Sequence, residues 1–191
     1  RKERHDMSTA IKTIDKPRLS VKAQTLATVA AIAGAVLIPQ VFHLIGAASG
    51  LGTALGEAFL PMHLPIILAG LLAGPYVGAI AGLLGPMVSF LISSMPGAAM
   101  LPIMMVELCA YGLAAGLLRN ANMPTIAKVL ITQVAGRIVR AAAILIAVFA
   151  FEREGVSVAA IWTAITTGLF GICMQWLLLP LIVYRVEHLN K

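Results

Sequence analysis

The middle of the chain contains no Asp, Glu, Lys or Arg between Glu57 and Glu107. An uncharged run of this length cannot form the surface of a water-soluble protein, because soluble domains carry roughly 25% charged residues. The run is also too long for a single membrane crossing, since a helical span takes about 20 apolar residues. Proline and glycine divide the region into three predicted membrane helices, Pro61 to Gly74, Tyr76 to Ser93 and Ala98 to Leu118.

The rest of the chain has the same apolar character. Of its 191 residues, 60% are hydrophobic and only 12% are charged. Further apolar segments run from Ala23 to about Gly46, from Ile126 to Phe151 and from Val158 to about Tyr184. We therefore predict an all-α integral membrane protein, a six-transmembrane-helix bundle. Its single membrane domain covers residues 23–185, between a basic tail at residues 1–22 and a short tail at residues 186–191.

The basic residues predict how this bundle lies in the membrane. The N-terminal tail alone carries seven Lys and Arg residues. Further basic residues fall on the same predicted side, namely Arg119, Lys128, Arg185 and Lys191. The opposite side has only Arg153, between Glu152 and Glu154. Because cytoplasmic segments carry the excess of Lys and Arg, both termini are predicted to be cytoplasmic. The net charge of +6 is thus explained by the basic residues that orient the bundle in the membrane, and no nucleic-acid partner is expected.

A glycine-rich segment, Ala47 to Phe59, follows the first predicted helix. It is too polar to span a membrane, so we expect a loop packed on the outer mouth of the bundle, able to move as a lid. Glu57 lies in this loop, and His63 lies near the outer end of the next helix. Both are candidates for contact with a substrate. Solvated or hydrogen-bonded helix ends are the alternative for the histidine.

Small residues recur at four-residue spacing, which allows helices to approach closely in lipid. The rows are Gly78 and Gly82, Gly112 and Gly116, and Ala23, Ala27, Ala31 and Ala35. For the glycine rows we favour packing within the bundle. For the alanine row, packing within the bundle and docking of a partner subunit are both open.

Three ionisable residues, Glu107, Arg137 and Arg140, lie inside predicted helices. At about 1.5 Å per residue, Glu107 and Arg140 lie roughly 13 Å and 16 Å from the outer ends of their helices, with Arg137 one turn deeper. Charges inside a membrane are costly and mark candidate functional sites. They predict either a structural ion pair or, because two arginines face one carboxylate, a surplus positive charge for an anionic ligand.

The sequence shows no catalytic or metal-binding pattern. It has no H-E-x-x-H, no Gly-rich phosphate loop with a lysine, and no paired catalytic carboxylates. Its two cysteines, Cys109 and Cys173, lie in apolar segments, where they are expected to act as small hydrophobic residues. We therefore expect no enzyme activity, no metal and no cofactor.

Four segments bear a family resemblance: HLPIILAGLLAGPYVGAIAGLLGP from His63, SSMP from Ser93, ELCAYGLAAGLL from Glu107, and AGRIV from Ala135. Together with the six predicted spans and the alanine row, they resemble the substrate-binding S components of energy-coupling factor (ECF) vitamin transporters. The resemblance extends from about Val21 to Tyr184, nearly the whole chain.

This resemblance implies a six-helix subunit that binds one vitamin in a pocket open to the outside of a bacterial plasma membrane. Transport then needs a scaffold membrane subunit and two ATPases. The alanine row, Ala23 to Ala35, is implied to contact the scaffold. The metal-transporting members carry an N-terminal histidine-bearing motif; the long basic tail here sets a metal substrate aside.

The predicted function is capture of a water-soluble vitamin or precursor for ATP-driven import. Pantothenate is the first candidate, because Arg137 and Arg140 offer positive charge to a carboxylate. Hydroxymethylpyrimidine, pyridoxine and the benzimidazole precursor of cobalamin remain open. The alternative from another class is a proton-coupled secondary carrier that acts alone through Glu107. The candidate substrate-binding residues are Glu57, His63, Glu107, Arg137 and Arg140.

Overall fold

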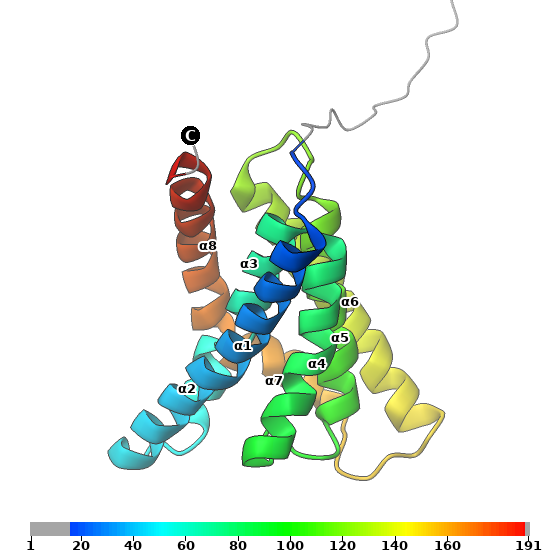
Figure 1. Ribbon diagram of the computed structural model, residues 1–191. Coiled ribbons are helices and arrows are strands. Elements are labelled where there is room, and N and C mark those ends of the chain that lie inside the picture. Colours follow the sequence, from blue (N-terminus) through cyan, green and yellow to red (C-terminus); the bar gives the residue numbers. More distant parts are fainter. Residues whose placement is uncertain (1–15, 190–191) are drawn as a thin grey trace, which may run out of the picture.

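The computed structural model describes residues 16–189, and over this range every regular element is a helix (Figure 1). Proline and glycine set most of the boundaries: Gly50 ends the first helix in a left-handed conformation, and Pro75 begins the fourth. The helices are α1 (Val21–Ser49), α2 (Ala54–Phe59), α3 (His63–Ala73), α4 (Pro75–Ser93), α5 (Leu101–Leu117), α6 (Thr125–Phe149), α7 (Ala159–Thr167) and α8 (Leu169–Leu189).

Length and apolar composition identify the segments that can cross a membrane. Five qualify: Val21–Ser49, Ala54–Ala73, Pro75–Ser93, Thr125–Phe149 and Leu169–Leu189. The apolar helix α5 is shorter, at 17 residues. Large hydrophobic side chains such as Leu26 and Leu91 are exposed on the outside of the bundle, where lipid would cover them. The predicted class, a helical membrane bundle, is confirmed, and the number of six spans stays a prediction.

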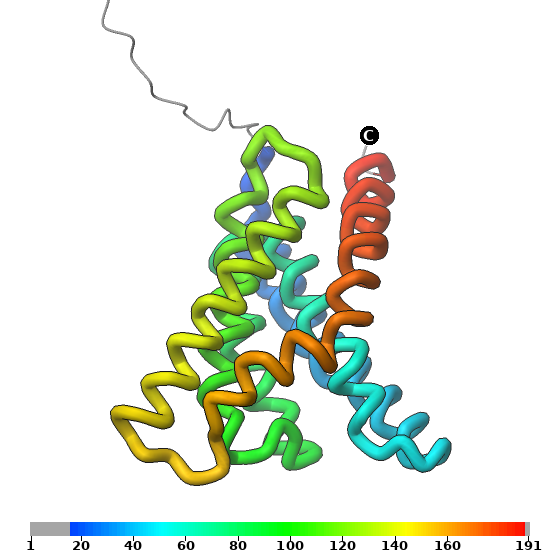
Figure 2. Tube along the Cα trace, turned by 180° about the vertical axis from the view of Figure 1, so that it is seen from behind, coloured from blue at the N-terminus to red at the C-terminus, as the bar shows by residue number. Residues whose placement is uncertain are grey.

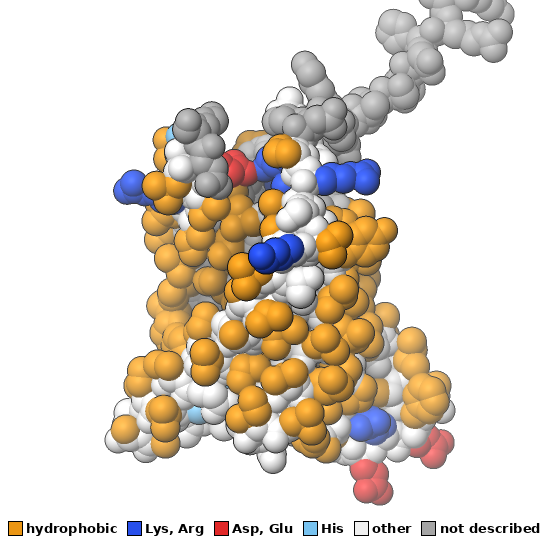
Figure 3. All heavy atoms as spheres, viewed as in Figure 1, with side chains coloured by type: hydrophobic (Ala, Val, Ile, Leu, Met, Phe, Trp, Pro, Cys, Tyr) orange, Lys and Arg blue, Asp and Glu red, His pale blue; other side chains and the backbone are white. Residues whose placement is uncertain are grey.

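Charged residues gather at the end of the bundle where α1 begins and α8 ends (Figures 1 and 3). Here Lys16 pairs with Glu187, and the guanidinium of Arg119 donates to the carbonyl of Pro17. The ammonium of Lys128 in turn donates to the carbonyl of Arg119. The loop from Glu152 to Glu154 lies at the opposite end. We call the first end basic; its cytoplasmic location is the prediction made from the sequence.

The glycine rows bring α4 and α5 into backbone contact. An ideal Cβ on Gly112 would lie 2.0 Å from the carbonyl oxygen of Gly78, and one on Gly82 would lie 2.1 Å from that of Leu108. Neither position has room for a side chain. The prediction that these rows pack within the bundle is therefore confirmed.

The alanine row of α1 faces the neighbouring helices of the same chain. Ala31 and Ala35 are buried, and Ala31 packs in one cluster with Ala69, Val77 and other small residues of α3 and α4. Ala23 and Ala27, nearer the basic end, are half-buried. Internal packing thus accounts for the deeper half of the row, while docking through the row stays a prediction.

The segment Ala47 to Phe59 is more ordered than predicted. The expected loop is wrong in part, because α1 continues to Ser49 and residues 54–59 form α2. Between them the chain reverses through Gly50 and Gly52, which have φ of 75° and 56°, values that favour glycine. The amides of Leu51 and Gly52 donate to the carbonyl of Gly46, which ties this turn to α1.

The last predicted span is not one helix. It divides at Gly168 into α7 and α8, and Figure 2 shows α7 running obliquely toward the base of α8. Close packing requires small residues here: an ideal Cβ on Gly168 would lie 2.8 Å from a methyl of Leu60, and one on Gly171 would lie 2.4 Å from the carbonyl of Phe59. The break lets α7 turn across the end of the bundle.

Candidate functional site

A cavity of about 560 Å³ opens at the end of the bundle opposite the basic end. Its walls come from α1, α2, the start of α3, α4, the α4–α5 loop, α5, α6 and α7. Its volume lies within the roughly 300–1,000 Å³ range of small-molecule sites. Four of the candidate residues from the sequence analysis line it, although they are as far apart in the chain as positions 57 and 140: Glu57, His63, Arg137 and Arg140.

The floor of the cavity is a cluster of charged and polar side chains around Glu107. Arg140 donates from Nη1 to Oε2 of Glu107 at 2.5 Å, and Arg137 donates from Nη1 to Oε1 at 3.4 Å. Nε2 of His63 lies 3.6 Å from Oε1 of the same carboxylate. The depth match predicted from helix counting thus corresponds to a direct contact between α5 and α6.

This cluster is deeply buried, with Glu107 fully inaccessible and His63 only 4% exposed. A solvated helix end is therefore the wrong alternative for this histidine. One carboxylate faces two guanidiniums, so the cluster has a formal surplus of one positive charge when His63 is neutral. Buried ion pairs need further hydrogen bonds to offset the loss of water.

Several nitrogens of the cluster lack such partners among the described residues. They are Nδ1 and Nε2 of His63, Nε and Nη2 of Arg137, and Nε of Arg140. Buried donors without acceptors are costly, so each calls for an explanation. His63, Arg137 and Arg140 also line the cavity, so a ligand bound there lies next to these side chains.

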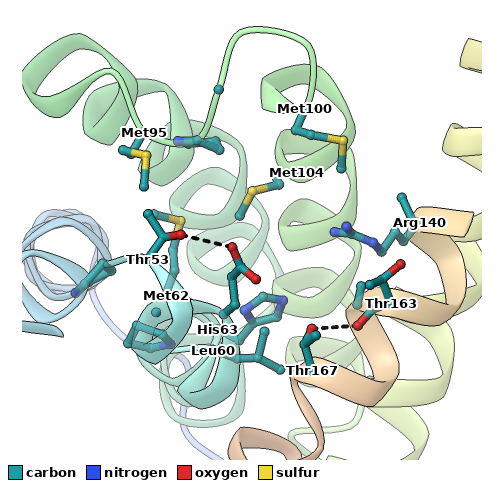
Figure 4. Close-up of a pocket in the computed structure, with 18 of the residues that line it drawn as sticks. Thr53, Leu60, Met62, His63, Met95, Met100, Met104, Arg140, Thr163 and Thr167 are labelled. Atoms are coloured by element: carbon teal, nitrogen blue, oxygen red, sulfur yellow. Dashed lines mark hydrogen bonds between the residues drawn. The ribbon is translucent and has the colours of Figure 1, made fainter. Parts of the chain in front are cut away.

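Methionines and threonines line the cavity around the charged cluster (Figure 4). Met62, Met95, Met100 and Met104 supply flexible thioether surfaces that adapt to an apolar ligand body. On α7, Thr163 and Thr167 donate their hydroxyl protons to backbone carbonyls one turn earlier. Their oxygens therefore remain available as acceptors.

Sequence reasoning missed these wall residues. A signal for the threonines exists in the four-residue spacing of Thr163 and Thr167, which places them on one helix face. For the methionines the only signal is position: Met95 and Met100 lie at or near the predicted connection at the outer end of two spans, where the pocket was expected. No sequence pattern shows that α7 turns across the cavity.

Glu57 lies on the α2 wall, above the floor. Its Oε1 accepts a hydrogen bond from the hydroxyl of Thr53 at 3.2 Å. The alanine row contributes no residue to the cavity lining. Within residues 16–189, no group of three or more His, Cys, Asp or Glu side chains comes together in a form that could hold a metal ion.

The fold and site together define a helical membrane protein with a solute-sized cavity at one end and a charged floor. Residues 21–183 of the sequence match the family described as "ECF transporter, substrate-specific component". The match covers most of the chain, and the protein belongs to this family. Comparison with curated proteins and with solved structures gave no match.

Membership confirms the family resemblance seen in the sequence. It makes the chain a substrate-binding subunit of a multi-pass membrane transporter rather than an enzyme. It also implies association with the ECF scaffold and ATPase subunits.

Proposed function

We propose that the protein captures a small vitamin or vitamin precursor bearing a carboxylate, with pantothenate as the first candidate. It would do so at the outer face of the bacterial plasma membrane. The observation that carries this proposal is the set of unsatisfied guanidinium and imidazole nitrogens beside a cavity with one surplus positive charge. A substrate carboxylate would supply both the acceptors and the missing negative charge.

Arginine suits this role because its planar guanidinium binds a carboxylate through two parallel hydrogen bonds. Arg140 is held by Glu107 at 2.5 Å, whereas the contact of Arg137 is longer, at 3.4 Å. Nη2 and Nε of Arg137 are both unsatisfied. Arg137 is therefore the residue we assign to the carboxylate, with Glu107 and Arg140 holding the cluster in place and Glu57 contacting the ligand from above.

Import would depend on the scaffold subunit and two ATPases that act with the family. A proton-coupled carrier working alone through Glu107 is the other class of function. That carboxylate is already engaged by two arginines, which does not favour a free proton acceptor. Hydroxymethylpyrimidine, pyridoxine and similar precursors lack the carboxylate and leave the unsatisfied donors of Arg137 without an anion.

Calorimetry in detergent tests the proposal with pantothenate and its alcohol analogue, pantothenol. We expect the acid to bind more tightly than the alcohol. Arg137→Gln should weaken binding of the acid by about 2–5 kcal/mol, the usual effect of removing one partner of a buried charge pair. The same change should alter binding of the alcohol much less.

Arg153→Gln is the matched control, because this arginine lies at the same end of the bundle but outside the cavity lining. It should leave both affinities unchanged. Equal affinity of the wild-type protein for acid and alcohol would contradict the carboxylate assignment. Mass spectrometry of ligand released from the purified protein would then identify the substrate directly.

A further inference from the structure

A second, smaller cavity of about 310 Å³ lies beside the first, between the ends of α1 and α4. We call it the side cavity. It is lined by Gln40, His43, Ala47, Gly52, Thr53, Ser93 and Met95. Three of these residues, His43, Thr53 and Met95, also line the main cavity. The two cavities therefore adjoin, with these three side chains at their boundary.

The side cavity differs from the floor of the main cavity in charge. It has no Asp, Glu, Lys or Arg in its lining, and its polar groups are an amide, an imidazole and two hydroxyls. Nε2 of Gln40 donates to Oγ of Ser93 at 3.0 Å, and Ser93 donates to the carbonyl of Ser89. Oε1 of Gln40 and both ring nitrogens of His43 make no hydrogen bond within residues 16–189.

The shape of the side cavity is fixed by backbone contacts. An ideal Cβ on Gly46 would lie 2.1 Å from the carbonyl oxygen of Gly52, so the turn after α1 rests directly on that helix. A Cβ on Gly56 would lie 3.0 Å from Cε1 of His43. The absence of a side chain at Gly56 thus makes room for the His43 ring at the boundary. A preformed polar cavity binds ligand groups at a smaller entropic cost than a mobile one.

We infer that the side cavity is a second substrate subsite, which binds the uncharged hydroxyl-bearing end of the ligand whose carboxylate lies on Arg137. This inference rests on the proposed function. The ligand would lie with its carboxylate on the floor and its apolar middle against the methionines. Its hydroxyl groups would contact Gln40, His43 and Ser93. The side cavity would thus distinguish long hydroxylated acids from short or fully apolar ones.

The test compares two acids that differ only at this end. One is pantothenate; the other is N-(3,3-dimethylbutanoyl)-β-alanine, which has the same carbon skeleton and carboxylate without the two hydroxyls. Calorimetry on the purified full chain gives the ratio of their dissociation constants. In the wild-type protein we expect the hydroxyl-free acid to bind about tenfold or more weakly, since each hydrogen bond contributes a factor of roughly 2–10.

Gln40→Leu should reduce this ratio at least about threefold, because it removes the Oε1 acceptor for the ligand hydroxyls and also the amide that holds Oγ of Ser93 in place. Gln24→Leu is the matched control: it makes the same change on the same helix, at the basic end, where the amide donates to the carbonyl of Leu19. It should keep the wild-type ratio. Ser93→Ala makes a second, smaller change, on α4, and should also reduce the ratio of the two dissociation constants.

The outcomes separate this inference from the proposed function. A wild-type ratio near one, or a ratio unchanged in both Gln40→Leu and Ser93→Ala, overturns the inference. If pantothenol still binds more weakly than pantothenate in those cases, the carboxylate assignment stands alone. If neither acid binds the wild-type protein, the substrate assignment falls and the second subsite falls with it.

Discussion

The ring of Tyr111 occupies the space beside Gly136 that any other residue would fill with its side chain. An ideal Cβ on Gly136 would lie 2.4 Å from Cε2 of this ring. Tyr111 is buried and meets His63 edge to face, with ring centroids 5.0 Å apart. The glycine of the AGRIV segment thus allows α5 and α6 to approach and supports the histidine on the cavity floor.

Gly136→Ala should therefore destabilise the protein and disturb the floor. The added methyl group forces the Tyr111 ring to move, and overpacking of this kind costs about 1–3 kcal/mol. Thermal unfolding in detergent should show a lower midpoint, and calorimetry should show weaker binding of pantothenate. The control for the unfolding midpoint is Gly97→Ala, because a Cβ there meets nothing within 4 Å; it is not a control for binding, since Gly97 lines the cavity. An unchanged unfolding midpoint in Gly136→Ala would contradict the packing argument.

Replacing Glu107 alone should lower the stability of the fold more than replacing Glu107 and Arg140 together. Glu107→Gln leaves two guanidiniums buried without an anion, which should destabilise the fold by about 3–5 kcal/mol. The double variant Glu107→Gln/Arg140→Gln keeps the formal surplus of one positive charge on Arg137. It should regain much of the stability and still bind pantothenate.

The two variants are compared by thermal unfolding and by calorimetry under the same detergent conditions. The single variant Arg140→Gln completes a double-mutant cycle, which gives the coupling free energy between Glu107 and Arg140. If the double variant is no more stable than Glu107→Gln, pairing of Glu107 with Arg140 does not hold the cluster together, and the charge argument fails.

The sequence predicted the contact between Glu107 and Arg140 because both lie on uninterrupted helices, where depth follows from residue number at about 1.5 Å per residue. It did not predict the burial of His63, the first residue of α3. That burial comes from contacts with α5, where Tyr111 meets the imidazole ring edge to face and Oε1 of Glu107 lies 3.6 Å from Nε2. Contacts made by a neighbouring segment leave no periodic signal in the helix they cover.

The alanine row shows a different limit of sequence reasoning. Small residues at four-residue spacing permit close approach of any helix, whether from the same chain or from a partner. Ala35 is fully buried in this chain, whereas Ala23 is half-exposed. The sequence alone does not distinguish these environments, because both positions obey the same spacing. The split of α7 from α8 at Gly168 likewise depends on packing against Leu60 and Phe59.

The docking prediction for the alanine row is best tested at its basic end. Ala23→Trp adds bulk where the side chain is half-exposed, so the unfolding midpoint and pantothenate affinity should stay as in the wild type. Co-purification with the scaffold and ATPase subunits should fall if this end of the row meets the scaffold. Ala35→Leu should instead lower stability by about 1–3 kcal/mol, because it overpacks the interior.

Val29→Trp is the control for bulk on the same helix, since Val29 is 58% exposed and its position in the helical turn places it away from the alanine row. It should leave the complex intact. Normal recovery of the complex with Ala23→Trp would contradict docking at this end of α1 and leave internal packing as the role of the row.

Movement of α2, the helical part of the segment 47–59, over the cavity is the last prediction. The turn is tied to α1 through Gly46, but α2 beyond it carries Gly56 and Glu57 on the cavity wall. Ligand bound beneath α2 should restrict the motion of this helix. A spin label on Ala54→Cys, a position that is exposed and outside the cavity lining, should lose mobility when pantothenate saturates the protein.

The label needs a background in which Cys109 and Cys173 are replaced by alanine, because both thiols are free. Ala30→Cys on the exposed face of α1 serves as the control and should give the same spectrum with and without ligand. Because α2 closes the cavity from the side of Glu57, Glu57→Gln should leave the mobility change at residue 54 in place while altering affinity. An identical spectrum at residue 54 across the whole titration would show that α2 is a fixed wall and not a lid.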